Sequence, residues 1–130
     1  MLKETIAYID YNGVERKETF YFNISESEAL EMEMGTEGGY SELIRKIIDT
    51  QDMPTLIHLW KEFVLKAYGE KSLDGKYLMK LDENGRPLSA KFAQTEAFNV
   101  LYMKLATDSN YASNFVNSVL PKEKKEPQQN

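Results

Sequence analysis

The sequence predicts an α+β fold that is mainly α-helical, with an N-terminal β-hairpin followed by about five helices packed as a small bundle. Short apolar stretches flank an Asn12-Gly13 dipeptide, and apolar residues recur at helical spacing in most later segments. The length of 130 residues fits one domain. We therefore expect a single globular domain over residues 1–120 and a disordered polar tail over residues 121–130, which lack apolar anchors.

The hairpin is predicted from its turn and from the residues on either side. Residues 6–9 form a short apolar strand, and Asn12-Gly13 tolerates the positive φ angles of a tight turn. The return strand is expected over residues 14–22, with Phe20 and Phe22 on one face.

The helices are predicted from capping residues and apolar stripes. Ser25 and Glu28 are expected to form a reciprocal capping box at the start of the first helix, which ends near Gly35. The later helices are expected at about residues 40–50, from Asp52 or Met53 to about Tyr68 with Gly69 as the stop, at about residues 90–106 after Ser89 as N-cap, and from Thr107 or Asp108 to about Val119.

The segment between the third and fourth expected helices is rich in turn signals. Asp74-Gly75 and Asn84-Gly85 are both typical of hairpin turns. Residues 77–79 are expected to be a short strand or an irregular packed loop.

Composition narrows the classes of function. The chain has no cysteine, which excludes disulfides and thiol chemistry and favours an intracellular protein. The first residues lack the pattern of a signal peptide, and no stretch approaches the ~20 apolar residues that span a bilayer. A membrane is therefore not an expected partner.

The formal net charge of −5 is concentrated in one segment. Residues 25–39 contain five acidic residues and no basic one. Nucleic acid is not an expected partner, because its binding needs clustered Lys and Arg that the foldable part of the chain lacks. The acidic segment is either a solvated helix face or an electrostatic docking surface that includes Glu28 and Glu31.

No residue pattern predicts catalysis, a cofactor or a metal. His58 is the single histidine, and its place beside Lys61 and Glu62 indicates an exposed helix position. One histidine and no cysteine leave no transition-metal site of the usual kind. Residues 69–72 lack the glycines of a phosphate loop, and residues 82–85 lack the alternating ligands of a calcium loop. We expect that the protein is not an enzyme.

The helix expected at residues 90–106 is apolar on two sides. Such a helix is either central in the core or buried against a partner, and the sequence leaves both open. Its two sides are Ala97, Phe98, Leu101 and Leu105 on one, and Phe92, Val100, Met103 and Ala106 on the other, with Tyr102 between them. Leu65 interrupts the polar side of the third helix and is a second candidate for exposed contact. The candidate partner-binding residues are Phe92, Val100, Tyr102, Met103, Leu65, Glu28 and Glu31.

A set of short stretches, taken in order, resembles one family. They are residues 20–25 before an acidic helix, Gly38-Gly39 followed by Ile44, Ile47, Ile48 and Asp49, residues 63–72 with Asp74-Gly75, residues 92–98, residues 105–108, Ala112, residues 115–117 and residues 119–121. In this order they resemble the tail assembly chaperones of long-tailed, non-contractile bacteriophages, the siphophage tail chaperone family. The resemblance covers nearly the whole chain except the first strand and the tail.

The resemblance implies a role in phage tail assembly. Such chaperones bind the tape measure protein in the host cell cytoplasm, help recruit tail tube subunits around it, and are absent from the mature virion. Homo-oligomer formation stays open, and so does a longer frameshifted product, for which Lys124-Lys125 has a compatible composition. The alternatives are a structural head–tail connector or tail-completion protein and, third, a small enzyme or nucleic-acid regulator.

Overall fold

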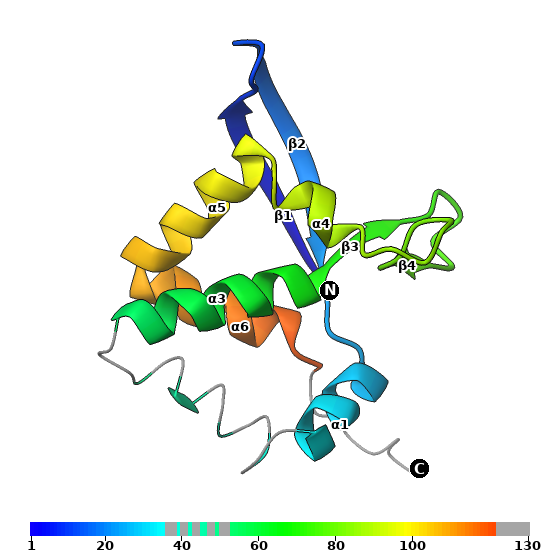
Figure 1. Ribbon diagram of the computed structural model, residues 1–130, viewed down its shortest axis with the longest axis vertical. Helices are drawn as coiled ribbons and strands as arrows, with labels where there is room; N and C mark the ends of the chain where they lie inside the picture. Colours follow the sequence, from blue (N-terminus) through cyan, green and yellow to red (C-terminus); the bar gives the residue numbers. More distant parts are fainter. Residues whose placement is uncertain (36–38, 40–41, 43–44, 47–48, 50–52, 122–130) are drawn as a thin grey trace, which may run out of the picture.

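The computed structural model describes residues 1–35, 39, 42, 45–46, 49 and 53–121, and it confirms the predicted α+β class. An antiparallel hairpin comes first, and helices follow with two short strands between them (Figure 1). The elements are β1 Leu2–Ile9, β2 Glu15–Phe22, α1 Glu26–Gly35, α3 Met53–Ala67, β3 Tyr68–Lys71, β4 Leu78–Met79, α4 Ser89–Phe92, α5 Glu96–Thr107 and α6 Ser109–Val119.

The described strands form one four-stranded antiparallel sheet in the order β1-β2-β3-β4. β1 and β2 pair along their whole length, from Leu2 opposite Phe22 to Ile9 opposite Glu15. β3 pairs with β2 only at Tyr21 and Phe22. Most of the hairpin therefore projects beyond the rest of the sheet, as the upper ends of β1 and β2 show in Figure 1.

The predicted hairpin turn at Asn12-Gly13 is confirmed. Gly13 has a φ of 78°, which favours glycine because it has no Cβ. The Asp10 carboxylate accepts hydrogen bonds from the backbone N–H of Asn12 at 2.9 Å and of Val14 at 3.0 Å. One side chain thus satisfies two turn amides. β1 begins at Leu2, earlier than predicted, because residues 2–5 pair with residues 19–22 of β2, and its charged residues lie at exposed or half-buried positions.

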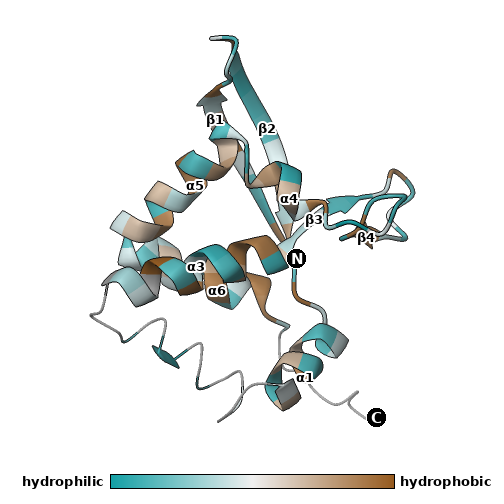
Figure 2. Ribbon diagram, viewed as in Figure 1, coloured by the Kyte–Doolittle hydropathy of each residue, from teal (hydrophilic) through white to brown (hydrophobic). Residues whose placement is uncertain are grey.

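The core lies where the inner face of the hairpin meets the helices. The Phe92 ring stacks on Tyr68 with 4.2 Å between centroids, and its centroid lies 5.2 Å from that of Phe20 and 5.7 Å from that of Phe98. In Figure 2, β2 is hydrophilic over most of its length, whereas apolar segments of α3 and α6 lie toward the middle of the molecule. The buried core residues are Ile6, Phe22, Ile24, Trp60, Phe63, Val64, Ala67, Tyr68, Phe92, Ala97, Phe98, Leu101, Leu105, Ala112, Phe115, Val116 and Val119.

α3 ends within one residue of its predicted end near Tyr68, but the predicted role of Gly69 as a helix stop is wrong. α3 ends at Ala67, and Tyr68 and Gly69 already belong to β3, where they pair with β2. Gly69 is therefore a strand residue and not a helix stop. A Cβ on Gly69 would lie 2.7 Å from Cγ of Leu78, so glycine is required by close packing. Pairing with a strand distant in sequence decides this boundary.

The single helix predicted at residues 90–106 is also wrong. Two helices, α4 and α5, replace it, and residues 93–95 separate them. Thr95 caps α5, because its Oγ1 accepts a hydrogen bond from the Phe98 backbone N–H at 3.1 Å. The break places Phe92 in the core, on an element separate from α5.

The N-caps predicted for the first and last helices are confirmed, and the one predicted at Ser89 is wrong. Ser25 caps α1, and the Asp108 carboxylate accepts from the Tyr111 backbone N–H at 3.0 Å at the start of α6. At α4 the N-cap position is Leu88, which makes no side-chain capping bond.

The predicted turns of the segment after α3 are confirmed. Gly75 and Gly85 have φ angles of 78° and 76°, and β4 is the short strand expected near residues 77–79. Of the helix predicted at residues 40–50, only residues 42, 45–46 and 49 are described, and each of them is helical; its other residues and most of the predicted tail, residues 122–130, lie outside the described residues.

Candidate partner-binding surface

The outer side of α5 is partly open to solvent. Its inner side carries Ala97, Phe98, Leu101 and Leu105, which are all buried. On the outer side, the exposed fraction is 42% for Val100 and 62% for Met103, one helical turn away. α5 contacts both β1 and α3; in Figure 1 it begins beside the hairpin and runs obliquely away from it, above α3. The helix is thus both a core element and a carrier of exposed apolar side chains.

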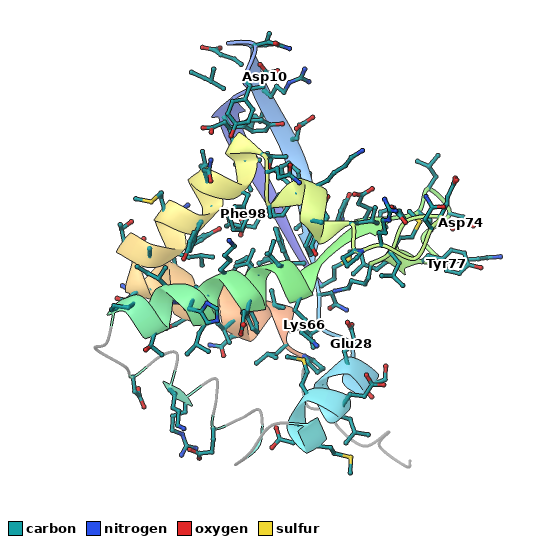
Figure 3. The ribbon with its side chains drawn as sticks, viewed as in Figure 1. Asp10, Glu28, Lys66, Asp74, Tyr77 and Phe98 are labelled. Atoms are coloured by element: carbon teal, nitrogen blue, oxygen red, sulfur yellow. The ribbon has the colours of Figure 1, made fainter. Side chains whose placement is uncertain are left out.

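Phe92 was expected on the same outer side and lies elsewhere. Its exposed fraction is 2%, and it contacts the rings of Tyr68, Phe20 and Phe98. Its predicted position on an outer surface is wrong, because the break before α5 turns α4 into the core. Figure 3 shows the Phe98 side chain, one of its partners, between α5 and the hairpin.

Tyr102 and Leu65 occupy intermediate positions. Both are half-buried and pack against the core cluster. The Tyr102 hydroxyl donates to the backbone oxygen of Ile57 at 2.7 Å, so it joins α5 to α3, and burial raises the pKa of this phenol.

The acidic helix α1 is held at its first turn. The Ser25 backbone N–H donates to Oε1 of Glu28 at 3.0 Å, and the Glu28 N–H donates to Oγ of Ser25 at 3.2 Å. This is the predicted capping box. Glu28 is therefore occupied locally, whereas Glu31 is exposed.

The apolar residues of α1 divide between core and solvent. Ala29 and Met32 pack against the core cluster, whereas Leu30 and Met34 are 61% and 82% exposed. Leu30 and Met34 are one turn apart on the outer side of the helix. α1 therefore presents a second pair of exposed apolar side chains, between acidic residues.

Lys80 joins four parts of the chain at one point. Its Nζ lies 2.7 Å from the backbone oxygen of Asn23, 2.8 Å from that of Lys66 and 3.0 Å from that of Ala67, which end α3. The Glu28 carboxylate of α1 lies 3.8 Å away. Burial lowers the pKa of Lys80, and the charge of Glu28 opposes that shift. The ammonium group caps the carbonyl end of α3 and carries its positive charge where the helix dipole favours it.

We call residues 70–88 the arm. It contains the end of β3 and all of β4, and it extends away from the helices (Figure 1). In Figure 3 the labelled Tyr77 points away from the helices. The exposed fraction is 63% for Tyr77, and Leu73, Met79 and Leu81 are also exposed. The arm is therefore a third place where apolar side chains meet solvent.

The remaining residues that were considered for catalysis or metal binding have structural roles or lie apart from other such residues. His58 is exposed as predicted, and its Nε2 lies 3.0 Å from Oε1 of Glu62, one turn along α3. The Asp82 carboxylate accepts from the backbone N–H of Asn84 and of Arg86, so residues 82–85 form a turn. Within the described ranges, no group of three or more His, Cys, Asp or Glu could hold a metal ion. No helix among these residues has the length and hydrophobicity needed to cross a bilayer.

The fold and these surfaces define a small α+β protein that carries apolar side chains on its outer helices and on its arm, as protein-binding modules do. The chain belongs to the family of phage tail assembly chaperones, whose model matches residues 1–129. This match confirms the predicted family, and membership indicates a non-catalytic role in tail assembly. Searches of curated proteins and of solved structures found no significant match.

Sequence reasoning missed Lys80 and the arm as parts of this surface. The contacts of Lys80 join residues far apart in the chain, and no local pattern marks such a lysine. The turn signals of the arm were visible, but only the structure shows that its apolar residues stay in solvent. The binding role of the predicted residues that reach the surface stays a prediction.

Proposed function

We propose that this chaperone binds the tape measure protein of its phage, keeps the apolar stretches of that protein from aggregating, and helps recruit tail tube subunits around it. It would act in the host cell cytoplasm and leave the tail before the virion is mature. Family membership supports a chaperone role in tail assembly, and the exposed apolar side chains supply the physical means.

The observation that carries this proposal is the exposed apolar pair on α5. Val100 and Met103 lie on a helix that the core fixes from its other side through Phe98 and Leu101. A rigid helix that presents an unbranched, adaptable methionine suits the apolar face of a guest helix. Leu30 and Met34 offer a similar pair on α1, beside acidic groups that would attract basic residues of a guest.

Co-expression with the tape measure protein of the same phage tests the proposal. We expect a complex that raises the soluble amount of the tape measure protein. The double variant Val100→Ser and Met103→Ser should weaken the complex by about tenfold, because it removes apolar area that binding would bury. The dissociation constant, measured by biolayer interferometry, gives the comparison.

Leu73→Ser is the matched control, since it also removes an exposed apolar side chain but lies on the arm. Equal losses for this control and for the α5 variant would contradict the assignment to α5. Failure to form any complex would contradict the proposed function itself. Stoichiometric copies of the chain in mature virions, measured by mass spectrometry, would contradict its departure from the tail.

A further inference from the structure

The outer edge of β2 is a strand edge with no described partner over most of its length. β2 pairs with β1 on one side from Glu15 to Phe22, but β3 covers its other side only at Tyr21 and Phe22. In the described part of the chain, no other strand pairs with β2. Residues 15–19 are exposed, and this part of the hairpin projects freely in Figure 1. Such an edge is a ready template for a further strand.

The pairing register shows which peptide groups point outward. The Asp10 backbone N–H donates to the Val14 oxygen, and Thr5 and Thr19 face each other with 3.0 Å between their Oγ1 atoms. In an antiparallel pair, hydrogen-bonded and non-hydrogen-bonded positions alternate. Glu15, Lys17 and Thr19 therefore occupy non-hydrogen-bonded positions toward β1. Their N–H and C=O groups point to the open edge.

Two contacts further along β2 support this alternation. Tyr21, the next residue in the series, pairs on the outer side with Gly69. Asn23, the one after it, donates its N–H to the Ala67 oxygen at 2.8 Å on the same side. The outward N–H and C=O groups therefore have partners at Tyr21 and Asn23. Those of residues 15–19 have no partner in the described sheet.

A groove opens where β3 leaves β2. It has a volume of about 260 Å³ and is lined by residues 18–21 of β2 and 68–71 of β3. Phe20 is half-buried there, with its ring against that of Phe92. The groove continues the open edge and has an apolar wall that a side chain of an added strand could contact.

Two carboxylates line the groove, those of Glu18 and Glu70, and the Glu18 carboxylate also accepts a hydrogen bond from the Tyr8 hydroxyl of β1. The Tyr68 hydroxyl donates to the Glu70 carboxylate at 3.1 Å. Burial raises the pKa of Tyr68, and the charges of Glu70 and then of Glu18 raise it further, so carboxylates from two strands act on one phenol. Lys71 lines the groove as well, so one ammonium group accompanies the two carboxylates; its Nζ donates to the Ser72 backbone oxygen at 3.0 Å. A basic side chain is the complement of this pair of carboxylates.

From these observations we infer that the open edge of β2 binds one extended segment of a guest polypeptide as an added antiparallel or parallel strand, with a basic side chain of the guest between Glu18 and Glu70. This inference rests on the proposed function, since the guest is the tape measure protein before it is covered by tube subunits. A second copy of the chain fits less well. Antiparallel pairing of two β2 edges centred on Lys17 would place two lysines opposite each other, and five residues bury too little area for a stable dimer.

Amide hydrogen exchange of the full chain tests the inference, alone and in complex with the tape measure protein. In the free chain, the N–H groups of Glu15, Lys17 and Thr19 should exchange faster than those of Arg16 and Glu18. In the complex, exchange at these outward positions should slow by about tenfold or more.

Two variants separate backbone pairing from side-chain contact. Lys17→Pro removes one outward N–H, which an edge strand tolerates, and Lys17→Thr keeps it. The proline variant should weaken the complex by about tenfold relative to the threonine variant. The double variant Glu18→Gln and Glu70→Gln should weaken it and reduce its dependence on salt.

The outcomes distinguish this inference from the proposed function. A stable complex with unchanged exchange at Lys17 and Thr19, and with equal affinity for both Lys17 variants, would overturn the added strand alone. Absence of any complex would overturn both. If the same amides become protected in the free chain as the protein concentration rises, two copies of the chain pair through this edge. That result would overturn the inference that a guest strand binds there.

Discussion

Lys80 shows at the scale of one residue how tertiary contacts hold the peripheral elements. Its three N–H groups match the three backbone oxygens of Asn23, Lys66 and Ala67. These oxygens belong to the link before α1 and to the end of α3, while Lys80 itself belongs to the arm. The arm and α1 therefore share one anchor point on the body.

Replacement of Lys80 by Met should destabilise the fold by about 1–3 kcal/mol, because it removes three hydrogen bonds to backbone oxygens and leaves that of Asn23, which is half-buried, without this donor. Methionine keeps most of the apolar stem, so lost packing contributes little. Urea denaturation followed by circular dichroism measures the effect. Lys76→Met, on the exposed part of the arm, is the control and should change stability by less than about 0.5 kcal/mol. Equal effects would show that the carbonyl contacts contribute nothing.

Asp10 gives the hairpin turn a dependence on pH. The hydrogen bond from Arg16 and the turn amides hold the pKa of Asp10 below its ordinary value of 3.8. Because the folded pKa is the lower one, the carboxylate stabilises the fold above about pH 3.8, and this contribution is lost as the pH falls through the folded pKa. Titration of the Asn12 and Val14 amide shifts by NMR should report this loss below pH 3.8. Asp10→Asn should abolish that titration; a titration that persists in this variant would assign the effect to another group.

At the scale of elements, β3 illustrates how pairing overrides local signals. The apolar pattern of this segment predicts a helix to about Tyr68 with Gly69 as its stop, so a helix ending in a C-cap is the local expectation. The structure instead extends the chain at Tyr68, because β2 offers hydrogen-bond partners and the ring of Phe92 stacks on that of Tyr68. The same aromatic cluster requires the break between α4 and α5, since a continuous helix would remove Phe92 from it.

Gly69→Ala tests the close packing of β3 against β4. The new Cβ would lie 2.7 Å from Cγ of Leu78, and we expect a loss of about 1–3 kcal/mol in the free energy of unfolding. Adding Leu78→Ala should relieve the clash, so the double variant should cost less than the sum of the single variants. Gly35→Ala is the control, because nothing lies within 4 Å of its added Cβ. Strict additivity in the cycle would contradict the contact.

At the scale of the whole molecule, stability is unevenly distributed. α5 and α6 each bury several side chains, whereas α1 has no buried residue and is attached through its cap, Ala29, Met32 and the Glu28 contact with Lys80. A helix of 10 residues is marginal without tertiary support. The apolar side chains proposed to meet a guest thus lie on elements of different rigidity: α5 is fixed, and α1 is weakly held.

Native-state amide exchange should reveal this difference. We expect amides in the middle of α1 to exchange at least about tenfold faster than those in the middle of α6, because opening α1 exposes little apolar surface. Lys80→Met should accelerate exchange in α1 further and leave α6 nearly unchanged. Similar protection in the two helices would show that α1 opens only with the whole domain.

The sequence by itself determined the features that depend on neighbours along the chain. Asn12-Gly13 set the hairpin turn, Ser25 with Glu28 and Asp108 set two helix starts, and helical spacing identified the buried side of α5 through Phe98 and Leu101. Turns, caps and periodicity involve groups only a few residues apart, so the local chain carries their energy.

Only the tertiary structure decided that β3 follows α3 directly, where α5 begins, that Phe92 is buried, and which groups Lys80 contacts. It also decided which apolar residues stay in solvent, as with Val100 and Met103, and where β2 is left without a second partner. The physical reason is that each depends on groups far apart in sequence, whose contact energy exceeds local preference and exists only once the chain has folded.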